Sequence, residues 1–277
     1  MAVDVSKRLG IYMRKRRKRA GWESLQELAE EMERIRKQKE EMERIRKLKD
    51  ESQPDKGWSE VSVSKSTLEK YENGSRWPTP KVSALWFEAV GVNFWYRDQI
   101  RKLMNPELWQ LDWGELPATP SEDNLKVLHS MGIAAAYLSD PMWKLLAANK
   151  QFLDMFPGLE VGMNVAEWML SSNWARLNIY NWRLRTHVLV SAIANIGQDI
   201  VPDEEIEDFK NRCGGYPEFN TFWTTDPPED QIMDTSMILR LPDGTLQRYI
   251  SGTTHGYHPP VLYSGYSLTL DPDFVFD

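Results

Sequence analysis

The sequence contains one cysteine, Cys213, among 277 residues. One thiol excludes an intrachain disulfide framework and is typical of a reducing compartment such as the cytoplasm. Long apolar runs are also missing: Val188 to Gly197 is among the longest, whereas a membrane-spanning helix needs about 18 apolar residues. Met1 to Arg8 has no apolar run behind its basic residues, so no secretory signal is expected. These absences predict a cytoplasmic protein that does not enter a membrane.

The motifs of common enzyme classes are missing as well. The sequence has no phosphate-binding glycine loop, no serine nucleophile elbow and no His-Glu-x-x-His. His255 and His258 have no evident third partner for a metal, and Cys213 is expected to be an inert packed thiol. We therefore predict no catalytic residue, no metal site and no resident cofactor. An enzyme acting in the C-terminal half is the weaker alternative.

The sequence does contain an uneven distribution of charge. Apolar residues make up 41% and charged residues 27%, which is an ordinary globular mixture. The net charge is −7, but residues 1–110 hold 24 Lys and Arg against 18 Asp and Glu, and residues 111–277 hold 10 against 23. A basic first part on an acidic remainder favours a polyanion-binding module. Drift of surface charge is the other interpretation.

The period of the apolar residues changes along the chain. Residues 9–104 have helical patterning, and two prolines with small polar residues at 116–123 indicate a linker. We predict an all-α domain at 1–110, a linker at 111–125 and an α+β domain with an antiparallel sheet at 126–277. Strands are expected at Ala134–Ser139, Met142–Ala147, Asp234–Leu241, Thr245–Ser251 and Tyr263–Leu270, and helices at Ser172–Ile196 and Asp203–Cys213.

Two serine caps mark helices in the first domain. Ser24 with Glu27 three residues later is a capping box, and Ser64 opens a second helix that Asn73-Gly74 closes. On this second helix the apolar residues share one face. The other face is short, polar and cationic at its start, as a helix entering a major groove needs; it carries Lys65, Ser66, Glu69 and Lys70.

These pieces resemble the Cro/repressor-like helix-turn-helix family, the XRE type, over residues 7–92. Leu9 to Gly21, Ser24 to Met32 and Val63 to Gly74 match its first, second and recognition helices. The sequence departs from the family at Leu25, where Gln is frequent, and by an insertion at about 33–60. The resemblance implies binding to double-stranded DNA. The expected contacts are Arg14, Arg17, Lys18, Ser24, Ser64, Lys65, Ser66, Glu69, Lys70, Asn73 and Arg76.

The insertion contains a repeat. The segment Glu30–Lys39 recurs at residues 40–49 with one change, because Gln38 is replaced by Leu48. Alternating Glu and Arg or Lys at helical spacing predicts that the second helix continues to about Asp50. Two interpretations stay open: a solvated charged arm, or a contact that makes a homodimer.

The second domain resembles the ligand-binding domain of MmyB-like transcription regulators, which has a PAS-like fold. Tyr137–Asn149, Asn181–Arg183, Pro202–Glu205 and Pro217–Trp223 carry the resemblance. It implies a small, largely apolar ligand such as a fatty acid. The expected lining is aromatic, with arginines for a carboxylate, and plain core packing is the alternative for each residue; it comprises Trp143, Phe152, Phe156, Trp168, Trp174, Trp182, Arg183, Arg185, Phe222, Trp223 and Tyr249.

The two resemblances together predict a nucleoid-associated transcription regulator that binds duplex DNA and senses a small apolar ligand. A DNA-binding interaction protein without a ligand, dimerising through its charged arm, is the main alternative. An enzyme is a weaker one.

Overall fold

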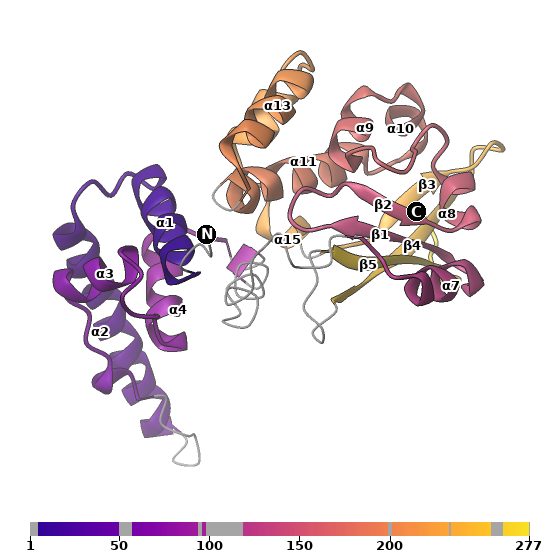
Figure 1. Ribbon diagram of the computed structural model, residues 1–277. Helices are drawn as coiled ribbons and strands as arrows, with labels where there is room; N and C mark the ends of the chain where they lie inside the picture. The colour runs from indigo at the N-terminus through magenta and orange to yellow at the C-terminus, as the bar shows by residue number, and fades with distance from the viewer. Residues whose placement is uncertain are drawn as a thin grey trace. The chain divides into compact units, whose positions relative to one another are not determined.

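The computed structural model describes residues 5–49, 57–93, 96–97, 119–198, 201–232, 234–255 and 263–276. The chain divides into two compact units, Met1–Asp112 (unit 1) and Trp113–Asp277 (unit 2) (Figure 1). Residues 111–118 of the predicted linker lie outside the described residues. Residues 122–125 are helical rather than linker, because Ser121 caps α7 (Glu122–Ser130) by accepting from the Asn124 N–H.

Unit 1 is built from helices. They are α1 (Val5–Arg19), α2 (Leu25–Lys49), a 3₁₀ turn η1 (Trp58–Glu60), α3 (Lys65–Glu72) and α4 (Pro80–Ala89). Each α-helix turns an apolar stripe inward, as amphipathic helices must to stabilise a small domain. Buried side chains come from each of these α-helices and include Leu9, Tyr12, Met13, Leu28, Met32, Leu68, Tyr71, Leu85, Trp86 and Phe87.

The serine side of both predicted caps is present. The Ser24 hydroxyl accepts from the backbone N–H of Gln26 and Glu27 at 3.1 and 3.5 Å. The Ser64 hydroxyl accepts from the Thr67 N–H at 3.2 Å, and α3 is followed by Gly74 at φ 76°. An N-cap of this kind stabilises a helix by about 1 kcal/mol. The short α3 therefore begins and ends where local chemistry places it.

Helices α1 and α3 approach each other closely at Gly10. A Cβ at this position would lie 2.4 Å from the backbone oxygen of Glu72. Only glycine leaves room for this approach. The role of Gly10 is not predictable from local sequence, because it depends on a neighbour 62 residues away in the chain.

Helix α2 continues to Lys49 as a single helix, as predicted. Leu28, Met32 and Ile35 on its first part are buried. The middle is held to the rest of unit 1 by Arg36, which donates to the Trp58 oxygen at 3.2 Å, and by Lys39, which pairs with Glu88. Beyond these anchors the helix becomes exposed; Met42, Ile45 and Leu48 are the large apolar residues there.

Unit 2 contains a five-stranded antiparallel sheet, so the predicted α+β class is confirmed at that level. The strand order is β2-β1-β5-β4-β3. The strands are β1 (Ala134–Ser139), β2 (Leu145–Ala148), β3 (Met237–Arg240), β4 (Leu246–His255) and β5 (Tyr263–Leu270). The β3–β4 hairpin turns at Gly244, at φ 88°, where the Leu241 N–H donates to the Thr245 oxygen.

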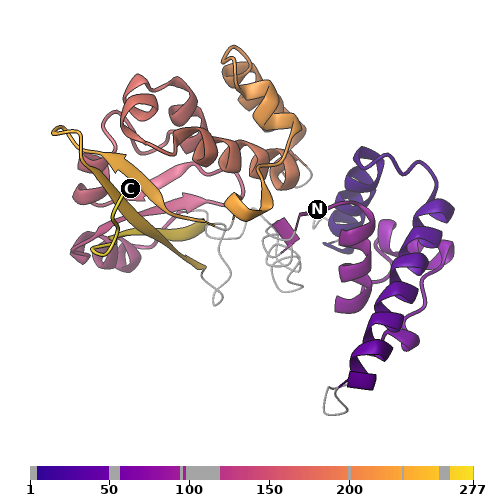
Figure 2. The same cartoon turned by 180° about the vertical axis from the view of Figure 1, so that it is seen from behind.

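The two faces of β1 bury different layers. Ala134, Ala136 and Leu138 join the main core, whereas Ala135 packs with Leu128 of α7. This alternation follows from the two-residue period of a strand. Figure 1 and Figure 2 show α7 on one side of the sheet and α9, α10 and α11 on the other.

One of the helices predicted in unit 2 is interrupted in the structure. The predicted helix Ser172–Ile196 is interrupted, because residues 179–181 leave the helix and Ile179 forms a bridge with Leu239 of β3. A contact with a distant strand thus overrides local helix propensity. Helix α13 has the predicted bounds. The helices are α8 (Lys150–Met155), α9 (Val165–Ser171), α10 (Asn173–Asn178), α11 (Trp182–Ala192), a π-helical turn η2 (Ile193–Gly197), α13 (Asp203–Cys213), α14 (Phe219–Thr224) and α15 (Glu229–Ile232).

Within the described residues, no helix has both the length and the apolar character that crossing a membrane requires.

Candidate functional site

Helix α3 presents two chemically different faces. Leu68, Tyr71 and Glu72 are buried against the rest of unit 1. Lys65 and Lys70 are exposed on the other side. A short helix with a buried stripe and an outward polar face is the geometry that a groove-reading helix needs. It is the first of two candidate sites in the chain.

Most of the predicted DNA contacts lie at the surface. Lys18, Ser64, Lys65, Ser66, Glu69, Lys70, Asn73 and Arg76 are exposed, as is Arg14, and Ser24 is partly buried at its cap. Lys65 lies 3.8 Å from Glu69, an exposed pair that contributes little. The Asn73 carboxamide oxygen accepts from the Ser75 N–H and shapes the turn after α3. The Lys65 ammonium is therefore only loosely engaged within the protein.

Arg17 is the exception among these residues. Its side chain is buried, 6% exposed, and its Nε donates to Glu72 Oε1 at 2.6 Å. A second bond joins Nη2 to Glu72 Oε2, and Nη1 donates to the backbone oxygens of Trp22 and Glu23. The prediction that Arg17 contacts phosphate is therefore wrong, because every arm of its guanidinium is used inside unit 1.

The Arg17–Glu72 pair fixes α3 on α1. Arg14 adds a bond from Nη2 to the Glu72 backbone oxygen at 3.1 Å. A bidentate arginine–carboxylate pair is directional as well as strong. This buried pair acts together with the apolar contacts of Leu68 and Tyr71 to hold α3, and with it the exposed face, in its orientation.

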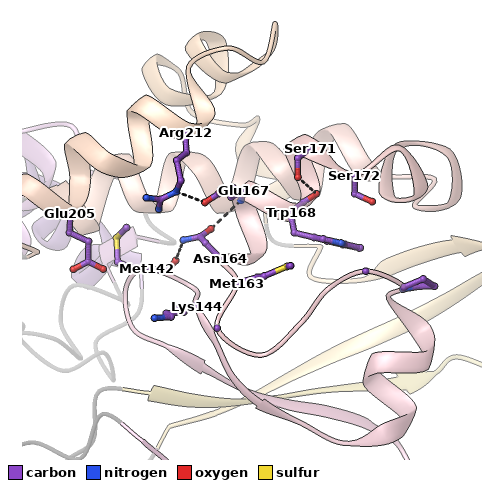
Figure 3. Close-up of a pocket in the computed structure, with 13 residues that line it drawn as sticks. Met142, Lys144, Met163, Asn164, Glu167, Trp168, Ser171, Ser172, Glu205 and Arg212 are labelled. Carbon is purple, nitrogen blue, oxygen red and sulfur yellow. Dashed lines mark hydrogen bonds and ion pairs between the residues drawn. The ribbon is translucent and has the colours of Figure 1, made fainter.

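Unit 2 carries the second candidate site, a pocket of about 600 Å³ (Figure 3). It is lined by the turn before β2, the loop before α9, α9 itself and α13. The volume lies within the range of small-molecule sites. The lining is Met142, Lys144, Pro157, Gly158, Gly162, Met163, Asn164, Glu167, Trp168, Ser171, Ser172, Glu205 and Arg212.

The loop that borders the pocket is held in place by backbone bonds. The Leu145 N–H donates to the Met163 oxygen, and the Gly162 N–H donates to the Leu145 oxygen at 2.7 Å. The Asn164 carboxamide donates to the Met142 oxygen and accepts from the Glu167 N–H. Gly162 has a φ of 98°, which favours glycine. This wall of the pocket is therefore preformed.

The pocket combines apolar and charged groups. Arg212 Nε donates to Glu167 Oε2 at 2.8 Å and joins α13 to α9 across it (Figure 3). This hydrogen bond raises the pKa of Arg212. The Trp168 indole projects from α9 and lines the pocket, and the side chains of Lys144 and Glu205, both exposed, line it as well (Figure 3). The arrangement suits an amphipathic small molecule.

The aromatic residues expected to line a cavity form packed clusters instead. Phe152 and Phe156 have ring centroids 4.9 Å apart, and Phe156 continues to Trp168 and Trp174 at 5.9 and 6.4 Å. Phe152 and Phe156 are buried in the main core. Of the predicted ligand residues, Trp168 is the one that lines the pocket.

The second aromatic cluster surrounds α14. Trp182 lies 6.3 Å from Phe222 and donates its indole N–H to the Met169 oxygen. Trp223 packs on Phe209 and Phe219. These side chains pack in the core, which was the alternative to lining a cavity. Trp143 and Tyr249 are partly buried against the same core.

The predicted carboxylate partners are placed apart from the pocket. Arg185 is buried and donates to the Asp234 oxygen at 2.7 Å, and Arg183 is exposed over the Phe222 ring. His187 stacks on Phe222, and burial lowers its pKa, so its neutral form is favoured. The pocket cations Lys144 and Arg212 were not predicted as ligand residues.

Other reactive groups carry no site. Cys213 is buried, and desolvation raises the pKa of its thiol to about 12, which leaves it unreactive at neutral pH. His255 ends β4, and His258 lies outside the described residues. Among the residues that the structure describes, no cluster of three metal-ligating side chains is found.

No family model matches the chain, and no curated protein matches it at a significant level.

Proposed function

We propose that the protein is a DNA-binding transcription regulator whose unit 1 contacts duplex DNA through the exposed face of α3. The observation that carries the proposal is the pairing of two properties in one helix. Lys65 and Lys70 face solvent, while Glu72 on the opposite side is locked to Arg17. A rigidly mounted polar helix loses little conformational entropy when it docks.

The distribution of charge along the chain supports DNA binding by unit 1. The basic residues concentrate in residues 1–110, although the whole protein is acidic. Lysines at a helix surface neutralise phosphates, and Ser66 or Asn73 can donate or accept at base edges. Lys18 and Arg14 on α1 are exposed and add cations for the DNA backbone.

The affinity of the full chain for duplex DNA is expected to fall steeply with salt. Each neutralised phosphate adds about 0.9 to the slope of log K against log salt, so three or four contacts give a slope near −3. Fluorescence anisotropy with genomic fragments between about 50 and 200 mM salt measures it. Binding to no fragment at the lowest salt, or a flat salt dependence, contradicts the proposal.

A second function is favoured by the pocket of unit 2. We propose that it binds a small amphipathic molecule, with the apolar part on Trp168, Met142 and Met163 and an acidic head near Lys144. The supporting observation is the preformed pocket of about 600 Å³ with this mixed lining. Such a molecule modulates DNA binding only if it has different affinities for the two states.

Decanoate is expected to shift the tryptophan emission of the full chain through Trp168. W168F removes the response, whereas W223F keeps it, because Trp223 packs in the core and does not line the pocket.

K144E weakens binding at least about fivefold by placing a carboxylate beside the ligand head. K150E is the matched control, since Lys150 is 83% exposed and outside the pocket. A response that survives W168F contradicts the assignment.

A further inference from the structure

Two nearly identical segments of α2 have opposite surroundings. In the first copy, residues 30–39, Met32 and Ile35 are buried, at 0% and 4% exposure. In the second copy, residues 40–49, the equivalent Met42 and Ile45 are 67% and 46% exposed. Identical local sequence thus forms a core in one copy and an open surface in the other.

The exposed copy presents one continuous apolar stripe. At 100° per residue, Met42, Ile45 and Leu48 fall within about 120° of the helix circumference and span roughly 9 Å along it. Leu48 is 80% exposed. It is also the one position where the copies differ, with Gln38 in the first. The difference adds apolar surface where the helix has left the body of unit 1.

The charges around the stripe are arranged in two halves. Glu41 stands at its start and Lys49 at its end, both exposed and both on the side of the stripe. A parallel copy would place like charges opposite each other. An antiparallel copy centred on Ile45 would pair Glu41 with the partner's Lys49, and Met42 with the partner's Leu48. The charges of the stripe are therefore complementary in the antiparallel orientation, and Glu41, which lies 3.7 Å from Arg44 of its own helix, would gain a second cation there.

We propose that residues 41–49 of α2 form a self-association surface that a second copy of this chain occupies in antiparallel orientation. Ile45 packs on the partner's Ile45 at the two-fold axis, with a Met–Leu layer and an ion pair on either side. The surface is isologous, as closed dimers require. The inference does not depend on DNA binding or on the pocket of unit 2.

The first experiment measures the mass of the full chain by sedimentation velocity between about 1 and 100 μM. The wild type is expected to associate to a dimer. I45E weakens association at least about tenfold, because it places two carboxylates together at the axis. I11E is the matched control: Ile11 is an exposed isoleucine on α1, at 47%, and its replacement leaves the dimer intact.

The second experiment tests the orientation. E41K places a lysine opposite the Lys49 of the second copy at both ends of the helix pair, so it weakens association. The double variant E41K/K49E restores association, because each ion pair is formed again with its two charges exchanged. In addition, I45C forms an intermolecular disulfide on mild oxidation, whereas L48C does so poorly because the two copies of that residue are separated by about 9 Å along the helices. Helicity by circular dichroism verifies that each variant is folded.

A wild-type chain that stays monomeric at 100 μM overturns the proposal. A dimer that I45E leaves unchanged, or that I11E disrupts equally, places the interface elsewhere. A dimer lost in I45E but indifferent to the charge exchange, with I45C and L48C crosslinking alike, overturns the antiparallel register.

Discussion

Replacing Glu72 by Ala is expected to destabilise unit 1 by about 3–5 kcal/mol. Removing one partner of a buried ion pair leaves the other charge desolvated and unpaired. Here the remaining group is the Arg17 guanidinium, which is 6% exposed. The loss is a large part of the stability of a small domain. Amide hydrogen exchange of α1 and α3 measures this loss of stability, because the amides of unit 1 are followed individually and are distinguished from those of unit 2.

The control for this prediction is on the same helix. E69A removes an exposed carboxylate whose nearest cation, Lys65, lies 3.8 Å away, and it is expected to change stability by less than about 0.5 kcal/mol. E72Q keeps an acceptor for Arg17 and falls between the two. Equal protection in E72A and E69A would show that the pair does not hold α3 on α1.

The double variant K65E/K70E is expected to lose about 2–3 kcal/mol of DNA affinity, roughly 30- to 150-fold, without loss of stability. Both side chains are exposed, so the variant changes the surface and leaves the core unchanged. Anisotropy with the tightest-binding genomic fragment measures the affinity. Unfolding curves that overlay on the wild type establish that α3 is intact.

The matched control moves the same charge to unit 2. K126E/K150E changes the net charge equally at exposed lysines, which are 73% and 83% exposed. It is expected to alter affinity by less than about threefold, because neither lysine belongs to the helix proposed to contact DNA and no phosphate contact is lost. If both double variants weaken binding alike, α3 is not the DNA-contacting helix.

The aromatic residues of unit 2 show what amino-acid composition cannot predict. A high density of Trp and Phe predicts large buried rings, and Phe152, Phe156 and Phe222 are buried. Composition does not tell a packed cluster from a lined cavity, since both need the same residue types. The pocket instead uses Lys144, Glu167 and Arg212, which come from the turn before β2, from α9 and from α13 and are up to 68 residues apart.

The sequence by itself determined features that depend on near neighbours. Helix α3 begins after the Ser64 cap and is followed by Gly74, as predicted. The bounds of β1, β5 and α13 are also as predicted, and the β3–β4 hairpin turns at Gly244. Strands β1 and β5 pair with each other across distant parts of the chain and were predicted from their residue types, whereas the cap, the turn and α13 rest on hydrogen bonds or backbone preferences within a few residues. Such interactions are encoded locally and are the same in almost any tertiary setting.

Tertiary structure alone decided the roles of residues whose local sequence is ambiguous. Arg17 belongs to a run of six cations, and only Glu72, 55 residues away, turns it from a surface charge into a buried partner. Met32 and Met42 share the same neighbours in sequence, yet one is buried and the other exposed. Burial depends on which distant surface is present, and no local pattern contains that information.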